Sequence, residues 1–221
     1  MPINLNQILT GSHFDSPYRH VHVKNFIDIE TVKILTENLA TDDFKYAERQ
    51  TGSDKTYQVF NNILFTLENQ QTNDGLHPAW VELIESITSE DYKAAVSKVI
   101  GHDVRNAYIE ITLKVYQQGD FISSHTDRSC VPVTHVLFLN LHWESAWGGD
   151  FCLHDSSQDI VKRITPLWNN SIIFKQSDQS WHSVEVCNNP QKSRIGLQIA
   201  FWSTQEKIKL DGREVGNREY T

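Results

Sequence analysis

Cysteine is scarce in this 221-residue chain, and its three copies show no pairing pattern. Cys130, Cys152 and Cys187 are odd in number and none lies in a C-x-x-C motif, so the sequence predicts neither a disulfide framework nor a cysteine-ligated zinc site. The N-terminus also lacks the basic and apolar segments of a secretory signal. These absences favour a reducing compartment, and we expect a cytoplasmic protein.

Long apolar runs are missing as well. Stretches such as 136–139 fall far short of the roughly 20 residues needed to cross a bilayer, which argues against a membrane span. Positive charge is in the minority, with 20 Lys and Arg against 28 Asp and Glu and a formal net charge of −8. We therefore expect no direct nucleic-acid binding through a broad basic surface, whereas a basic protein partner stays open.

No repeat, low-complexity tract or flexible linker divides the chain, so we expect one domain over residues 1–221. Its first part, 1–107, is predicted to be a helical support region with an N-terminal strand over 18–24. Asp28 is a plausible N-cap for a first amphipathic helix, Pro78 opens a second, and a third ends at Gly101. Residues 41–56 are polar and show no periodic pattern.

From Tyr108 the apolar period changes to two, which predicts a half-buried strand over 108–116. Seven further short strands are expected, over 121–124, 134–142, 150–154, 160–165, 171–175, 181–186 and 194–202. Helices first and a block of strands afterwards indicate an α+β fold whose helices brace a β-sandwich or barrel over 108–202. The tail, 203–221, carries mixed charge and is expected to pack loosely.

The candidate chemistry centres on His125 and Asp127, which are spaced by two and can point the same way from an extended segment. An H-x-D pair alone is weak evidence. It gains weight from His182 on a second predicted strand and from Arg194 at the start of a third. Two imidazoles and a carboxylate can occupy one face of an octahedral Fe(II), and an arginine can hold a carboxylate through a bidentate pair.

Three segments, 115–128, 134–155 and 161–202, resemble the Fe(II)/2-oxoglutarate-dependent oxygenases of the prolyl-hydroxylase type. Within that superfamily the chain is most similar to the catalytic domain of ribosomal-protein prolyl 3-hydroxylases. The resemblance implies a distorted double-stranded β-helix of the jelly-roll or cupin kind, braced by N-terminal helices. It implies Fe(II), 2-oxoglutarate and O2, with ascorbate as a candidate additional cofactor.

The same resemblance implies a role for each site residue. His125, Asp127 and His182 correspond to the iron ligands and catalytic centre, and Arg194 and Tyr116 to the residues that bind 2-oxoglutarate. Strict alternation places Tyr116 on the polar face of its strand, so either that face lines a wet pocket or a bulge turns the ring.

Two positions depart from the family pattern. Gly196 stands where many relatives have a serine, so a second hydroxyl contact to the co-substrate is expected to be lost. Phe138 stands where some prolyl hydroxylases present a tyrosine, which leaves Tyr116 as the phenol of the site.

Asp127 favours hydroxylation over halogenation, because halogenases of this superfamily have Gly or Ala at the carboxylate position. We therefore predict a dioxygenase that hydroxylates an unactivated C–H bond of a prolyl residue in a protein or peptide. A hydroxylase of a free or carrier-bound amino acid or small metabolite is the alternative substrate reading. Alternatives of another class are a non-catalytic metal-binding β-barrel, in which Arg194 has no use, and a zinc hydrolase, for which no general base is visible.

Weaker candidates surround this set. Arg128 and Asn140 are candidates for substrate binding. His20 and His22 form an H-x-H pair but lack a nearby third ligand. The remaining histidines on or beside strands are expected to pack in the core or to support the metal ligands, namely His135, His142 and His154. The tryptophans of the second half are expected to form the core and the rim of the barrel, namely Trp143, Trp147, Trp168, Trp181 and Trp202.

Overall fold

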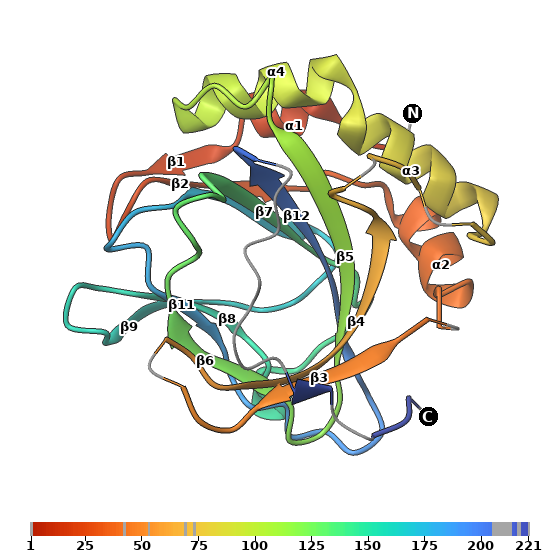
Figure 1. The fold of residues 1–221 in the computed structure, drawn as a ribbon, viewed down its shortest axis with the longest axis vertical. Helices are drawn as coiled ribbons and strands as arrows, with labels where there is room; N and C mark the ends of the chain where they lie inside the picture. The colour runs from red at the N-terminus through yellow and green to blue at the C-terminus, as the bar shows by residue number, and fades with distance from the viewer. Residues whose placement is uncertain are drawn as a thin grey trace.

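The computed structural model describes residues 2–41, 43–52, 54–68, 70–72, 74–204, 214–215 and 218–220. It consists of two antiparallel layers of strands that face each other, with helices over the outer face of the larger layer (Figure 1). The helices are α1 (Leu5–Leu9), α2 (Ile29–Glu37), α3 (Pro78–Thr88) and α4 (Glu90–Ile100), with a 3-10 turn η1 (Ser145–Trp147).

The larger layer has the strand order β1-β2-β10-β7-β12-β5-β4, with β3 paired to β4 and β13 to β3. The smaller layer has the order β6-β11-β8-β9 and joins the larger one where β4 pairs with β6. This is the double-stranded β-helix arrangement that the family resemblance implied. The strands are β1 (Ser12–Phe14), β2 (His20–Lys24), β3 (Lys45–Arg49), β4 (Tyr57–Phe65), β5 (Tyr108–Tyr116), β6 (Phe121–His125), β7 (Val133–Phe138), β8 (Phe151–His154), β9 (Ile160–Ile164), β10 (Asn170–Lys175), β11 (His182–Val184), β12 (Arg194–Trp202) and β13 (Glu214–Val215).

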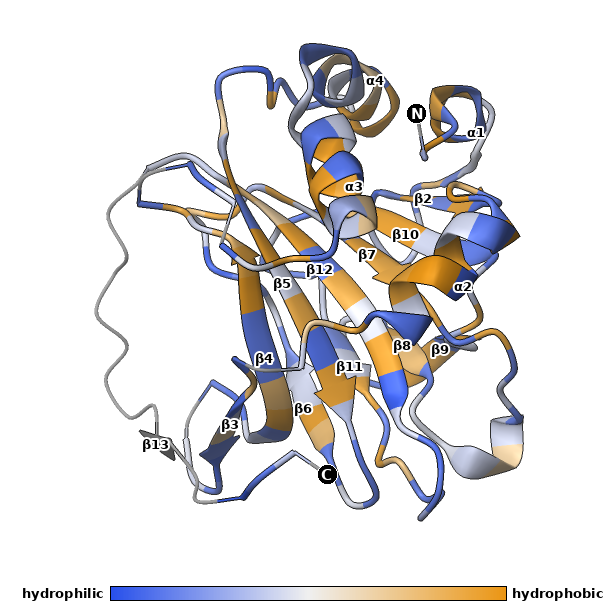
Figure 2. Cartoon of the chain, turned by 90° about the vertical axis from the view of Figure 1, so that its right-hand side faces the viewer, coloured by the Kyte–Doolittle hydropathy of each residue, from blue (hydrophilic) through white to orange (hydrophobic). Residues whose placement is uncertain are grey.

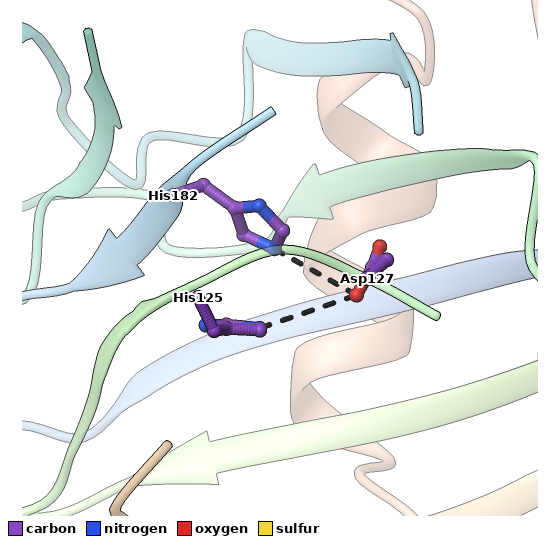
Figure 3. A group of neighbouring side chains, drawn as sticks. All are labelled: His125, Asp127 and His182. Atoms are coloured by element: carbon purple, nitrogen blue, oxygen red, sulfur yellow. Dashed lines mark ion pairs between the residues drawn. The ribbon is translucent and has the colours of Figure 1, made fainter. Parts of the chain in front are cut away.

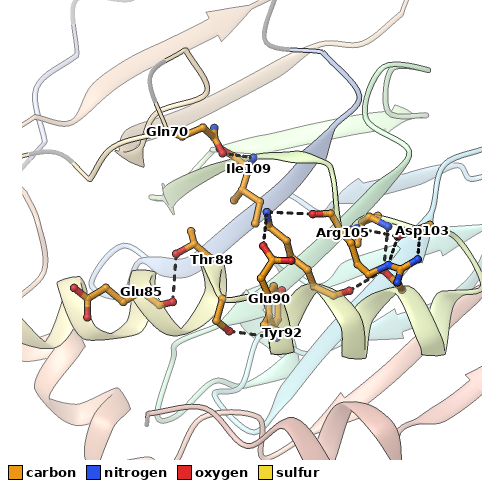
Figure 4. Close-up of polar contacts among 12 residues, drawn as sticks. Gln70, Glu85, Thr88, Glu90, Tyr92, Asp103, Arg105 and Ile109 are labelled. Atoms are coloured by element: carbon orange, nitrogen blue, oxygen red, sulfur yellow. Dashed lines mark hydrogen bonds and ion pairs between the residues drawn. The ribbon is translucent and has the colours of Figure 1, made fainter.

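The predicted helix ends are confirmed by their capping geometry. The Asp28 side chain accepts the backbone N–H of Thr31 at 2.9 Å, and Pro78 occupies the first turn of α3. Gly101 ends α4 in the left-handed conformation with φ of 68°. Ser89 begins α4 by accepting the backbone N–H of Tyr92, a contact drawn beside Tyr92 in Figure 4.

The alternation of β5 sorts its side chains onto two faces, as predicted. Ile109, Ile111 and Leu113 belong to the apolar cluster between the helices and the larger layer. Figure 2 shows this packing as hydrophobic stripes on α3 and on the strands beneath it. The opposite face, with Lys114 and Tyr116, borders the cavity between the two layers. The β5–β12 register runs without a shift from Tyr108 to Tyr116, so the polar face lines a pocket and no bulge is needed to turn Tyr116.

The first half of the chain is less helical than predicted. The polar stretch 41–56, expected to be irregular, contains β3, and 57–65 forms β4, which lies at the centre of the topology. A β3 strand is hard to recognise because its partly exposed residues follow no clear alternation. β4 is obscured because its register against β5 shifts between Ile63 and Phe65.

The expectation of a loosely packed tail is wrong for residues 218–220. Arg218 forms an ion pair with Asp120 at 2.5 Å and lies over the rings of Tyr46 and Phe60, at 5.2 Å from each centroid. The Tyr220 ring packs in a tilted arrangement against Phe44 and edge-on against Phe60. The rest of the tail, apart from 203–204 and β13, lies outside the described residues.

Among the helices that the structure describes, none combines the length and the apolar character needed to span a bilayer.

Candidate functional site

The structure brings His125, Asp127 and His182 together from two segments, the end of β6 and the start of β11. His125 ends β6, His182 begins β11, and the two residues pair directly across these strands. Asp127 follows β6, and its Oδ1 lies 4.0 Å from His125 Nε2 and 3.8 Å from His182 Nε2 (Figure 3). These separations are too long for hydrogen bonds. They bring three atoms of the kinds that bind divalent ions within 4.8 Å of one another, so the group could hold a metal ion.

Hydrogen bonds to the other polar atom of each of the three side chains orient the ligand atoms. The Nδ1 atoms of His125 and His182 lie 2.9 Å from the carbonyl oxygens of Ser123 and Ser180. A carbonyl only accepts, so each Nδ1 carries the proton and each Nε2 presents a lone pair toward Asp127. Thr134 donates to Asp127 Oδ2 at 2.7 Å, which leaves Oδ1 directed at the imidazoles.

Burial keeps both imidazoles neutral. It holds the pKa of His125 well below its usual value, and the neighbouring His182, Lys55 and Lys114 lower it further. Burial also lowers the pKa of His182, although the Asp127 carboxylate acts in the opposite direction. Neutral imidazoles beside a carboxylate are the protonation state that metal binding requires.

Arg194 and Tyr116 form the second feature of the site. They face each other across β12 and β5, with the guanidinium carbon 4.8 Å from the centre of the Tyr116 ring. Arg194 is only 2% exposed, and its Nε donates to the carbonyl of Gly149 at 2.7 Å. Its Nη2 is buried and has no hydrogen-bond acceptor among the described residues.

A buried guanidinium with a free N–H is costly unless an anion completes it. Burial also raises the pKa of Tyr116, so its phenol stays protonated and can donate. The two residues therefore fit the far carboxylate of a dicarboxylic co-substrate.

One cavity of about 330 Å³ contains the whole set, because all five predicted residues line it. That volume is at the lower end of the range for small-molecule sites. Arg128 lines the cavity too. Asn140 does not, because its side chain bridges the Ser193 carbonyl, to which it donates, and the Ile195 N–H, which it accepts. It supports the start of β12 instead of facing the pocket.

Two residues that shape the site carried no recognisable sequence signal. Thr134, which orients Asp127, lies in a predicted strand but at no diagnostic spacing from the ligands. Gly149 lies in no diagnostic sequence pattern, yet its carbonyl accepts the Arg194 N–H and it adopts φ of 72°. An added Cβ there would lie 2.9 Å from Cys187 Sγ and 3.3 Å from Arg194 Cδ. Only Gly fits this position without displacing the arginine.

Gly196 is explained by similar crowding. An added Cβ would lie 3.1 Å from the Leu137 carbonyl oxygen and 3.4 Å from Arg194 Nη1. Glycine therefore leaves the guanidinium its space. The centre of the Phe138 ring lies 5.3 Å from the guanidinium carbon of Arg194. Phe138 therefore offers the guanidinium a ring face, at the position where some prolyl hydroxylases have a tyrosine.

The remaining histidines fall outside the metal-binding group. His135 bonds to the Tyr92 hydroxyl and to Ser171, and His154 to Ser183 and the Gln158 carbonyl. Among the described residues, His125, Asp127 and His182 form the one cluster of three or more metal-binding side chains, so His20 and His22 belong to none.

Comparison with known proteins points to one family. Residues 111–203 match the family model described as the 2OG-Fe(II) oxygenase superfamily. Prolyl 3-hydroxylase OGFOD1 of Mus musculus is 23% identical over 193 residues, which cover 84% of this chain and 33% of that protein. The Xenopus laevis protein of the same name is 22% identical over 152 residues, covering 66% and 29%. The chain thus spans about a third of the length of these relatives.

Solved structures share the fold. A Pseudomonas putida prolyl-4-hydroxylase aligns with a TM-score of 0.60 at 15% identity, covering 90% of this chain and 96% of that one. A Trichoplax adhaerens prolyl hydroxylase, solved with a peptide fragment of the hypoxia inducible factor oxygen degradation domain, aligns with a TM-score of 0.56 at 15% identity, covering 90% and 86%.

Proposed function

We propose that this chain, whose residues 111–203 match the family model of the 2OG-Fe(II) oxygenase superfamily, hydroxylates an unactivated C–H bond of a prolyl residue in a protein or peptide. The observation that carries the proposal is one cavity with His125, Asp127 and His182 together on its wall and the unpaired Nη2 of buried Arg194 in the same lining. This combination suits a metal ion and a carboxylate-bearing co-substrate bound side by side.

His125, Asp127 and His182 would hold the iron, and Arg194 with Tyr116 the far carboxylate of 2-oxoglutarate. When bound, Fe(II) and 2-oxoglutarate supply the oxidation, in which O2 delivers one oxygen atom to succinate and one to the C–H bond. The chain's own part is positioning. Thr134 and the Ser123 and Ser180 carbonyls orient the ligand atoms, and Gly149 holds Arg194. The aromatic rings of Phe151 and Phe174 pack against His182 and exclude water from that side.

The prolyl substrate is favoured by the names of the relatives, which are prolyl hydroxylases in both the sequence and the structure comparisons. A free or carrier-bound amino acid or small metabolite is the alternative. A non-catalytic metal-binding barrel is disfavoured, because it leaves the unpaired, buried Nη2 of Arg194 without a function. A cytoplasmic location also belongs to the proposal and is supported by the free state of Cys130, Cys152 and Cys187.

The test is to load the purified protein with Fe(II) and 2-oxoglutarate, add air, and follow succinate with and without prolyl peptides. Mass spectrometry of the peptides should show a gain of one oxygen atom on proline that matches the extra succinate. Bound metal with no succinate above the metal-free control would favour the non-catalytic barrel. Oxygen gained only by free amino acids would favour the small-molecule alternative.

A further inference from the structure

The cavity has a charge opposite to that of the chain. The whole protein is acidic, with a formal net charge of −8. Its cavity lining nevertheless contains six cationic side chains and three acidic ones. The cationic ones are Lys45, Arg49, Lys55, Lys114, Arg128 and Arg194, and the acidic ones Asp54, Glu110 and Asp127.

The groups of the proposed reaction do not cancel this excess. Asp127 and Arg194 are assigned to the metal and the co-substrate, whose own charges of opposite sign balance. Arg49 is paired with Asp54 at 2.5 Å. The rest of the described lining contains Lys45, Lys55, Lys114, Arg128 and the acidic Glu110. Lys55, Lys114 and Glu110 have contacts of their own, so the inference depends on Lys45 and Arg128.

These cations line the cavity from several elements. Lys45 on β3 and Lys114 on β5 both lie opposite Asn61 of β4, so the register places the three in one row across the sheet. Lys55 follows β3, and Arg128 directly follows Asp127. Lys45 is exposed and the other three are partly exposed, so a molecule entering the cavity can reach them. Arg128 forms no side-chain hydrogen bond or ion pair within the described part of the chain.

We propose that the substrate carries carboxylates beside the carbon that is hydroxylated, and that they are acidic side chains flanking the prolyl residue of a peptide. This inference rests on the proposed function and names its substrate class. A cleft lined by one sign of charge concentrates ligands of the opposite sign, whatever the net charge of the protein. Arginine and lysine also bind carboxylates through charge-assisted hydrogen bonds. The cavity thus selects an acidic segment even though the surface as a whole suits a basic partner.

The experiment compares short peptides that share a central proline and differ in their flanking residues, which are Glu, Gln or Lys. Affinity is measured without O2, in protein loaded with Mn(II) and 2-oxoglutarate, so that binding is read independently of turnover. We expect the Glu peptide to bind about tenfold more tightly than the Gln peptide at low salt, because each partly exposed ion pair contributes a factor of roughly 1.5 to 5. Added salt should reduce this preference.

Charge-removing variants assign the preference to the cavity. Arg128→Gln and Lys45→Gln should each lower the Glu-over-Gln ratio, while Lys98→Gln, an exposed charge on the outer helix α4, should leave it unchanged. Free proline and prolinamide form the second arm. If free proline binds and prolinamide and the Glu peptide do not, the carboxylate that the cavity selects is that of a free amino acid.

Equal affinities for the Glu and Gln peptides, or no binding by any carboxylate probe, would overturn the inference. Succinate formed equally well with Gln or Lys peptides would overturn it while leaving the proposed function intact. Tight binding of the Glu peptide without any turnover would support the selection of acidic peptides by the cavity and would contradict the assignment as an oxygenase.

Discussion

At the scale of single residues, the site depends on side chains whose charges are buried and whose orientation is set by hydrogen bonds. Asp127 is the one acid of the metal group, and Thr134 holds its second oxygen. Asp127→Ala should therefore lower iron affinity by at least about tenfold and abolish succinate formation, because two imidazoles alone leave the ion without its anionic ligand. Iron stoichiometry and succinate, measured side by side with the exposed Asp178→Ala control, provide the check. Parent turnover in Asp127→Ala would remove the carboxylate from the metal group.

Arg194 is the residue on which the co-substrate assignment depends. Arg194→Met keeps a long apolar stem but removes the donor that is unpaired in the cavity. The Michaelis constant for 2-oxoglutarate should rise by about tenfold or more, because a charged hydrogen-bonded pair contributes about 1.5–3 kcal/mol. Iron binding should persist, since Arg194 lies outside the metal group. The matched control is Arg105→Met, which removes an exposed arginine paired with Asp103. An unchanged Michaelis constant in Arg194→Met would show that another group anchors the co-substrate.

At the scale of elements, the turn before β8 is as important for the site as the strands. Gly149→Ala combines a left-handed backbone with a Cβ placed 2.9 Å from Cys187 Sγ, whereas Gly75→Ala has a similar φ of 79° and open space. Both should lose about 1–2 kcal/mol in the free energy of unfolding from backbone strain. Only Gly149→Ala should also raise the 2-oxoglutarate requirement, because it displaces Arg194. Denaturant unfolding and 2-oxoglutarate titration of both variants separate the two effects, and equal Michaelis constants would count against a role for the turn.

At the scale of the whole molecule, Arg218 near the C-terminus contacts residues far away in the sequence, namely Asp120 and the rings of Tyr46 and Phe60. Asp120 is fully buried, and burial raises its pKa although the Arg218 charge lowers it. Arg218→Ala should reduce the free energy of unfolding by about 1–3 kcal/mol at pH 7, less than for a fully buried pair because Arg218 is partly exposed.

The pH dependence of that loss follows from the sign of the Asp120 shift. A carboxyl group whose pKa is higher in the folded protein than in the unfolded chain binds its proton more tightly when folded. Its charged form therefore destabilises the fold at pH values above the folded-state pKa. This destabilisation disappears as the pH falls below the unfolded-state pKa. The destabilisation by Arg218→Ala should therefore shrink between pH 7 and the usual range of aspartate. Urea unfolding across that range is the measurement, with Asp120→Asn/Arg218→Ala as the variant that should be insensitive. A loss that stays constant with pH would place the effect in ring packing instead of charge.

The sequence by itself determined the parts of this protein that depend on local periodicity and on residue type. Alternation over 108–116, the Asp28 and Gly101 caps and the H-x-D pair followed by His182 and Arg194 each predict a feature that the structure contains. Only the tertiary structure decided what depends on long-range contacts. β3 has no clear pattern of its own and exists because β4 and β13 pair with it. Asn140 was expected in the pocket, but its amide supports the start of β12, and Gly149 carries a role that appears only where its turn meets Arg194. The excess of positive charge in the cavity lining could not be predicted from the sequence either. Net charge is a sum over all residues, whereas strand register decides which residues line the cavity.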